Sequence, residues 1–298
     1  MRNRLLRALA ALLTGVVCSG NAQTQPCGSF VATDYTQGKV FIFEQGKIVW
    51  EHEAPLSNDV WVLENGNLLF TTGNGVLEVT RDKDTVFCYR SASRIFACQR
   101  LADGNTFIGE CNAGRLLEVT PRGEIARCVS ILPEGVTNAG SAFMRNARRL
   151  DDGHYLVAHY GGGRVVEYDE QGREVWSVEA GGGPHSVIRL PDGNTLVAIA
   201  DADDNPRIVE YDPQGREVWR LTNDDLEGRP LRFMSGMQYV EGVGLYLTNW
   251  QGHRPRVEAP HLLLVTRDKR VVCTVPPMEG VMTFSSVFVP QSGGKIRH

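Results

Sequence analysis

Two residues that could act on a substrate, His185 and Arg145, occur at the same phase of a repeated sequence pattern. Each lies eight residues before the glycine of a predicted tight turn, Gly193 for the histidine and Gly153 for the arginine. An imidazole titrates near neutrality, so it can exchange a proton or attack an activated ester. A planar guanidinium pairs with sulfate, phosphate or carboxylate. Together, the two side chains are candidates for anion binding or for group transfer.

The same count finds the matching position in the other repeats. It reaches Asn58 and Phe96 in two earlier repeats and Ser285 near the end of the chain, while the sixth repeat offers Met234 or Ser235. Because equivalent positions of a repeat occupy equivalent places in a fold, we expect these side chains to gather at one site. Residues that follow these positions, or that occur in adjacent loops, extend the predicted ligand site: Asp34, Tyr35, Asp59, His159, Tyr160, Ser186, Asn249 and Trp250.

Acidic residues near the same loops suggest a second chemistry. Asp201 and Asp203 belong to an Asp-Ala-Asp-Asp run, and Glu110 ends a predicted strand. Carboxylate oxygens are calcium ligands, so Glu110, Asp201 and Asp203 form a candidate metal site. A solvated acidic loop explains the same residues without an ion, and no complete ligand spacing is present in the sequence. We therefore expect no cofactor, with calcium as the alternative.

Six copies of one short strand-and-turn unit organise the chain, among them RVVEYDEQG from Arg164 and RIVEYDPQG from Arg207. A second hairpin with Asn-Gly or Asp-Gly at its turn precedes the central copies, as in RLDDGHYLV around Gly153. Four short strands joined by two tight turns and a loop, at a period of roughly 40–50 residues, describe a β-propeller blade. A β-sandwich also has short strands, but it does not require the same turn residue at the same phase.

The ends of the repeat region predict a closed ring. The first repeat begins with FVATD from Phe30 and lacks its innermost strand, while Thr283 to Val289 is a strand without partners of its own. If the late strand completes the first blade, no sheet edge stays open. We therefore predict an all-β fold, a six-bladed β-propeller of four-stranded antiparallel blades closed by the C-terminal strand, as one domain over residues 23–298. The only expected helical turn begins at Thr222.

Two segments carry a family resemblance. GRVVEYDEQGREVW from Gly163 resembles the PQQ-like repeat of quinoprotein-like propellers, and PHSVIRLPDGNTLVA from Pro184 is similar to arylsulfotransferase-like propellers. The second resemblance implies that a channel histidine, here His185, and an arginine, here Arg145, handle a sulfuryl group. Ser186 stands where that family usually has aspartate. A quinone cofactor normally needs a larger, eight-bladed ring, so the first resemblance implies none here.

The first 22 residues predict a signal peptide. Three arginines precede the ten residues from Ala8 to Val17, which are mostly apolar, and a small-residue cleavage signal ends at Ala22. Ten residues are too few to cross about 30 Å of hydrocarbon, so we expect a periplasmic or secreted protein without a membrane span. Removing the leader leaves 28 basic against 35 acidic residues, a net charge of −7. This balance excludes a nucleic-acid partner, because no basic surplus neutralises phosphates.

Outside the leader the chain has six cysteines, an even number that permits disulfides in an exported protein. These six cysteines, which allow 15 complete pairings, are Cys27, Cys88, Cys98, Cys111, Cys128 and Cys273. Cys98 and Cys111 share one face of a predicted hairpin and are the favoured local pair. Cys88, Cys128 and Cys273 lie near the position of tryptophan in other repeats, which favours a packing role. No CxxC motif occurs, so a cysteine zinc site is not expected.

These features favour an exported β-propeller that binds a small molecule or a protein at one mouth of its channel, with no established catalysis. The turns inside the hairpins are short, whereas loops on the other face, such as HYGGG from His159, are longer and more varied. Two enzymatic alternatives stay open. One is an arylsulfotransferase-like group-transfer enzyme that uses His185, and the other is a metal-dependent lactonase-like hydrolase. A polar channel mouth is also common in propellers without any activity.

Overall fold

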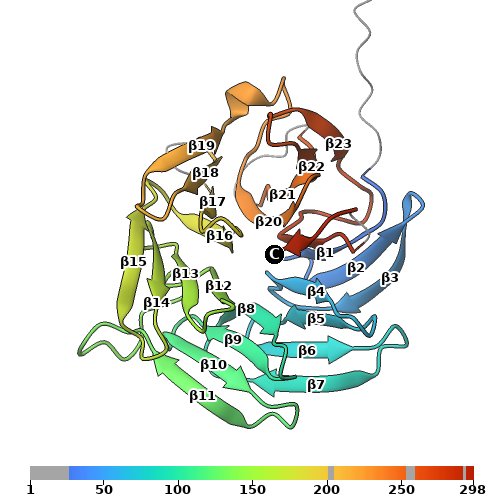
Figure 1. Cartoon of the computed structure of the whole chain (residues 1–298). Coiled ribbons are helices and arrows are strands. Elements are labelled where there is room, and N and C mark those ends of the chain that lie inside the picture. Colours follow the sequence, from blue (N-terminus) through green and yellow to red (C-terminus); the bar gives the residue numbers. More distant parts are fainter. Residues whose placement is uncertain (1–26, 201–204, 253–258, 291–292) are drawn as a thin grey trace, which may run out of the picture.

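The computed structural model of the protein describes residues 27–200, 205–252, 259–290 and 293–298. Six β-sheets form the blades of a ring, with their innermost strands turned toward a common centre (Figure 1). This architecture confirms the predicted all-β, six-bladed propeller. The predicted signal peptide and the candidate metal ligands Asp201 and Asp203 lie outside the described residues.

Each blade consists of antiparallel strands that follow one another from the centre to the rim. In blades 2 and 3 the strands are β4 (Val60–Val62), β5 (Leu68–Thr71), β6 (Gly75–Val79), β7 (Thr85–Arg90), β8 (Ile95–Arg100), β9 (Thr106–Glu110), β10 (Arg115–Val119) and β11 (Ile125–Ser130). In blades 4 and 5 they are β12 (Asn146–Arg149), β13 (Tyr155–His159), β14 (Arg164–Tyr168), β15 (Glu174–Glu179), β16 (Pro184–Arg189), β17 (Thr195–Ile199), β18 (Arg207–Tyr211) and β19 (Glu217–Leu221). Blade 6 contains β20 (Met234–Val240), β21 (Gly244–Asn249), β22 (Leu262–Val265) and β23 (Val271–Val275).

Blade 1 joins the two ends of the chain. It consists of β24 (Ser286–Phe288), β1 (Phe30–Asp34), β2 (Lys39–Glu44) and β3 (Lys47–Glu53), in that order from the centre. The ladder pairs Ala32 with Val287, so the late strand supplies the inner edge that the first repeat lacks. The predicted closure by the C-terminal strand is confirmed. A disulfide between Cys27 and Cys273 adds a second closure, because it ties the segment before β1 to β23 of blade 6.

The other cysteines differ from the prediction. Cys98 and Cys111 are both buried and free, so the favoured local pair does not form. The Cys111 sulfur instead accepts a hydrogen bond from the backbone N–H of Met144 at 3.3 Å. Cys88 and Cys128 are free and exposed, so the packing role predicted for them is wrong. Cys273 forms the disulfide and is also buried in a hydrophobic cluster that spans blades 6 and 1, so it does have a packing role.

The glycines at the predicted turns adopt the backbone conformation that a tight turn requires. Gly153 has a φ of 98° and Gly193 a φ of 88°, a region that side chains with a Cβ rarely enter. The aspartate before each glycine closes the turn, as where an Asp192 oxygen accepts from the N–H of Asn194 at 3.0 Å. These turns fix the register of the inner two strands and thereby the position of every residue at the start of the inner strand.

Neighbouring blades are held together by apolar side chains and by a repeated ion pair. Hydrophobic clusters span adjacent sheets, as where Ala158 of blade 4 packs with Val187 of blade 5. In four blades a glutamate of the third strand binds an arginine of the next blade. These inter-blade ion pairs are Glu78–Arg100, Glu118–Arg149, Glu167–Arg189 and Glu210–Arg267. The repeat therefore encodes contacts between blades as well as the blades themselves.

Two short elements depart from the four-stranded pattern. The strand β25 (Ile296–Arg297) adds to the inner edge of blade 6 by pairing with β20, which the sequence did not reveal. The predicted helical turn is the 3-10 helix η2 (Asn223–Asp225), and the Asp225 carboxylate accepts from the N–H of Thr222 at 2.9 Å. Across the part of the chain that the structure describes, no helix is long and apolar enough to span a membrane.

Candidate functional site

A pocket with a volume of about 120 Å³ lies where the inner strands begin. Its walls come from five of the six blades and the loops that join them. The lining residues are Tyr35, Asn58, Arg145, Tyr160, His185, Phe233, Ser235, Trp250 and Ser285. The sequence count along the repeats therefore finds residues that do share one cavity.

Bulges at the start of three inner strands help to place these residues. The ladder of β16 skips His185, that of β20 skips Ser235, and that of β8 skips Phe96. A bulge leaves one residue out of the ladder and re-aims its side chain. In the sixth repeat the inner position is thus Ser235, while Met234 is fully buried in the core between blades.

Arg145 is the charged group of the pocket. Its guanidinium carbon lies 4.6 Å from the ring centroid of Phe96 and 5.3 Å from that of Tyr160, so two aromatic rings hold it. No carboxylate among the described residues forms an ion pair with Arg145, and its buried Nε has no hydrogen-bond acceptor there. The pocket thus presents a positive charge that is partly removed from water.

His185 is held in one orientation beside this charge. Its Nδ1 lies 2.7 Å from the backbone carbonyl oxygen of Ser235. A carbonyl oxygen only accepts, so Nδ1 carries the proton and the lone pair of the neutral ring lies on Nε2. The rings of Tyr160 and Phe233 pack edge-on against the imidazole, at centroid distances of 5.8 and 5.3 Å. With an exposed fraction of 6%, His185 is a buried group at the pocket wall.

Aromatic rings continue around one side of the pocket. Trp250 packs edge-on against Phe233 at 5.1 Å and against Tyr35 at 6.2 Å. Asn249 builds this wall from behind: its Oδ1 accepts from the N–H groups of Arg232 and Phe233, at 2.6 and 3.3 Å. Asn249 is fully buried and is not among the lining residues of the pocket, and it shapes the loop that carries Phe233.

Short polar side chains also line the pocket. The Ser285 hydroxyl lies 2.9 Å from that of Thr33 and donates to the carbonyl of Ser57 at 3.0 Å, which joins blades 1 and 2. The N–H of Asn58 donates to the hydroxyl of Thr71 at 3.0 Å. The pocket is therefore amphipathic, because aromatic rings, small polar groups and the guanidinium of Arg145 share its lining.

Comparison with known proteins agrees with this architecture. Residues 137–274 match the sequence model of a family described as outer membrane protein assembly factor BamB. The chain is a six-bladed β-propeller, and about half of it is similar to this family. A protein of unknown function from Bacteroides caccae is 25% identical to it, with a TM-score of 0.78 over 87% of this chain and 97% of that one. No curated protein matches the sequence.

Two other solved structures share the propeller fold. Virginiamycin B lyase from Staphylococcus aureus, solved with quinupristin, is 17% identical, with a TM-score of 0.56 over 88% of this chain and 87% of that one. BamB from Moraxella catarrhalis is 13% identical, with a TM-score of 0.51 over 92% of this chain and 91% of that one. Identities this low show the fold alone.

Asp59, predicted to contact a ligand, instead belongs to a buried cluster of the propeller. It receives two hydrogen bonds from the guanidinium of Arg148, at 2.7 and 3.0 Å, and lies 3.2 Å from Nε2 of His298. Burial alone would raise the pKa of Asp59, but the Arg148 charge and the His298 hydrogen bond hold it below its ordinary value. This carboxylate is therefore neutralised inside the protein and is not among the lining residues of the pocket.

His159 and Ser186 are likewise structural in the propeller. Nδ1 of His159 donates to the carbonyl of Phe143 at 3.0 Å, and Nε2 accepts from the Tyr168 hydroxyl at 2.8 Å. Burial lowers the pKa of His159 to about 4, so the ring is neutral at physiological pH. Ser186 is buried in the ladder opposite Ala198. Neither residue lines the pocket, because each follows an inner position or ends a second strand.

Glu110, the described member of the candidate calcium site, is already neutralised. One of its oxygens accepts from Nε of Arg115 at 2.6 Å, and the other accepts from the Tyr89 hydroxyl at 3.0 Å. Burial, together with the Glu110 charge, raises the pKa of Tyr89 to about 12, so this hydroxyl remains a donor. Both Glu110 oxygens are thus engaged by Arg115 and Tyr89, and the calcium site with Asp201 and Asp203 stays a prediction.

Proposed function

We propose that this β-propeller is exported and binds a small anionic ligand in the pocket at the channel mouth. The observation that carries the proposal is the state of Arg145, whose guanidinium is held between Phe96 and Tyr160 and, among the described residues, has no carboxylate partner. A partly desolvated cation is stabilised by a counter-ion. Guanidinium binds carboxylate, sulfate or phosphate through paired, charge-assisted hydrogen bonds.

The dimensions of the pocket favour a small molecule over a protein segment. Its volume of about 120 Å³ lies below the range of about 300–1,000 Å³ that pockets for drug-sized ligands occupy. The aromatic wall of Phe233, Trp250 and Tyr35 suits the apolar part of such a molecule. We therefore infer a ligand with one anionic group and a compact apolar body.

Export is supported by two independent features. The N-terminal succession of arginines, apolar residues and small residues is typical of a signal peptide. The Cys27–Cys273 disulfide suits a protein that works in an oxidising compartment, since disulfides persist outside the cytosol. Both features favour the periplasm or the exterior of the cell.

A group-transfer reaction of the arylsulfotransferase-like kind is the second candidate function. The observation in its favour is the hydrogen bond from Nδ1 of His185 to Ser235, which puts the lone pair of the neutral ring on Nε2. An imidazole nitrogen in this state can accept a proton or attack an activated ester. Arg145, which lines the same pocket, would hold the anionic group of the substrate.

Calorimetric titration with sulfate, phosphate and an aromatic carboxylate tests the binding proposal. Arg145→Met keeps an apolar stem against Phe96 and removes the charge, so we expect at least a tenfold loss of affinity at an unchanged melting temperature. Arg122→Met, at the exposed turn between the two outer strands of blade 3, which contributes no lining residue, is the matched control and should bind as the parent does. Equal affinities in the two variants contradict an anion site at Arg145.

The second candidate has a separate readout. A purified sample is mixed with an aromatic sulfate ester and a phenolic acceptor, and release of the leaving group is measured. Turnover that His185→Asn abolishes, while anion binding persists, would assign a catalytic role to Nε2. Binding without turnover in the parent protein leaves the ligand-binding function standing alone.

A further inference from the structure

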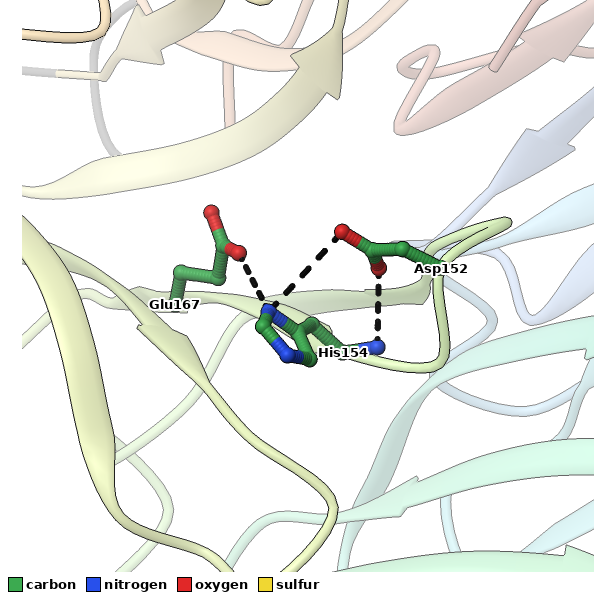
Figure 2. A group of neighbouring side chains, drawn as sticks. All are labelled: Asp152, His154 and Glu167. Carbon is green, nitrogen blue, oxygen red and sulfur yellow. Dashed lines mark hydrogen bonds and ion pairs between the residues drawn. The ribbon is translucent and has the colours of Figure 1, made fainter.

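A second group of side chains lies at the far end of the inner strand of blade 4. Arg145 precedes β12, whereas Asp152 and His154 lie in the turn that follows it, and Glu167 projects from β14 (Figure 2). Nδ1 of His154 is 2.7 Å from a Glu167 oxygen and 3.8 Å from an Asp152 oxygen. One donor atom from each residue lies within 4.8 Å of the other two. This group is separate from the pocket.

The repeat shows how blade 4 differs from its neighbours. In blades 2 and 5 the residue at the position of His154 is an asparagine, Asn67 or Asn194, whose Nδ2 donates to the strand glutamate at 2.7 Å. Blade 4 keeps this distance but replaces the amide with an imidazole. An amide nitrogen cannot bind a metal as an imidazole nitrogen does. The substitution therefore adds a metal-binding atom and leaves the structural contact intact.

The three donor atoms are close to the geometry that zinc requires. With bonds of about 2.0–2.2 Å and tetrahedral angles, two ligand atoms on one zinc ion lie roughly 3.4 Å apart. The observed separations of 2.7 and 3.8 Å bracket this value. Rotation of the Asp152 side chain, which is 61% exposed, can shorten the 3.8 Å separation, and rotation of the His154 ring, which is 31% exposed, can lengthen the 2.7 Å separation. Glu167 is only 10% exposed and is therefore the fixed member.

Charge and support also suit a divalent cation. Asp152 and Glu167 contribute two negative charges, and the inter-blade ion pair with Arg189 offsets one of them. Arg189 binds one Glu167 oxygen in this ion pair, and the other Glu167 oxygen faces the imidazole of His154. Groups that hold a ligand carboxylate in place in this way are typical of metal sites.

We propose that Asp152, His154 and Glu167 bind one zinc ion, with water as the fourth ligand. The three ligand atoms are one nitrogen and two oxygens, a set that suits zinc as a borderline metal ion. The hairpin turn that contains Gly153 holds two of the ligands, Asp152 and His154, close together. The site joins two strands of one blade beside the contact with blade 5. Zinc binding stabilises the folded propeller, because the unfolded chain does not assemble the three ligands.

Calorimetric titration of zinc into the EDTA-treated, tag-free protein tests this proposal. We expect one ion per chain and a higher melting temperature when zinc is present. His154→Asn restores the residue of blades 2 and 5, so the fold should persist while zinc affinity falls at least tenfold. Asp152→Asn removes a carboxylate yet keeps an oxygen for the turn hydrogen bond to the N–H of His154, and it should weaken zinc binding as well.

Blade 5 supplies the converse experiment. Asp192, Asn194 and Glu210 occupy the same three positions there, without an imidazole. Asn194→His should therefore create a second site and raise the stoichiometry from one zinc ion to two. Cobalt in place of zinc should give the visible absorption of a tetrahedral ion in the parent and about twice that in this variant. The proposal is overturned if the parent binds no zinc, if His154→Asn binds it equally well, or if Asn194→His gains no site.

Discussion

Nδ1 of His185 donates a hydrogen bond of 2.7 Å to the backbone carbonyl of Ser235, and this bond joins blades 5 and 6 at the pocket. Both residues occupy β-bulges at the start of their inner strands. Since a bulged residue is left out of the ladder, the Ser235 carbonyl accepts from the imidazole and not from the neighbouring strand. One hydrogen bond thus joins the bulge of β16 to the bulge of β20.

This relationship predicts that His185 contributes to stability as well as to the pocket. His185→Ala leaves the buried carbonyl of Ser235 without its donor, which should cost about 1–3 kcal/mol of unfolding free energy. His185→Asn places an N–H donor near the former Nδ1 and should recover most of that loss. Urea unfolding of the three proteins measures the difference. An alanine variant as stable as the parent would show that the bond between blades carries no energy.

The predicted site residues that the structure brings together are those fixed by the repeat. A turn glycine at constant phase sets the register of the inner hairpin, so counting back from it reaches Asn58, Arg145, His185 and Ser285, all of which line the pocket. Phe233 escapes this count because it lies on a loop between blades with no equivalent in other repeats. Its position depends on the buried amide of Asn249 and on the N–H of Trp250, which donates to the carbonyl of Phe233 at 2.9 Å.

Contacts between segments that are far apart in the sequence cannot be predicted by counting residues from the turn glycines. Asp59 resembles a ligand contact from its place in the chain, but its partners Arg148 and His298 come from another blade and from the end of the described chain. The disulfide joins Cys27 to Cys273 over a separation of 246 residues. Only ring closure brings such pairs together, and the local pattern does not contain that information.

Removing the disulfide tests how much ring closure depends on it. Cys27→Ser with Cys273→Ser frees the segment before β1 from blade 6, and the lost constraint on the unfolded chain should cost about 2–4 kcal/mol. The melting temperature should fall, while β24 still pairs with β1 and keeps the ring closed. Calorimetry of oxidised parent, reduced parent and double variant measures this. The reduced parent should match the variant, and a variant as stable as the oxidised parent contradicts the prediction.

The buried His159 predicts loss of stability in acid. Its pKa is about 4 in the folded protein and 6.5 ordinarily, because burial disfavours the charged ring. Between these values the unfolded chain binds a proton that the folded protein refuses, so stability falls as pH decreases from 6.5 toward 4. The loss from this group amounts to about 1.4 kcal/mol per pH unit at its steepest.

Urea unfolding at several pH values separates this effect from that of other groups. His159→Phe should lower stability near pH 7, because the hydrogen bonds with Phe143 and Tyr168 are lost. The variant should then lose less stability than the parent as the solution becomes acidic, so the two curves converge. Parallel curves would mean that His159 is protonated equally in both states.

Gly183 offers a way to disturb the pocket without altering a lining residue. A Cβ at this position would lie 2.5 Å from a ring atom of Tyr160, so Gly183→Ala must displace the ring that packs against Arg145 and His185. We expect anion affinity to fall several-fold in this variant. Gly162→Ala is the matched control, because its new methyl group would meet only the Cβ and the carbonyl oxygen of His159, at ordinary distances of 3.6 and 3.7 Å. Titration of both variants with the same anion measures the difference. Equal affinities would mean that the ring of Tyr160 does not contribute to anion binding, and that Arg145 binds the anion without it.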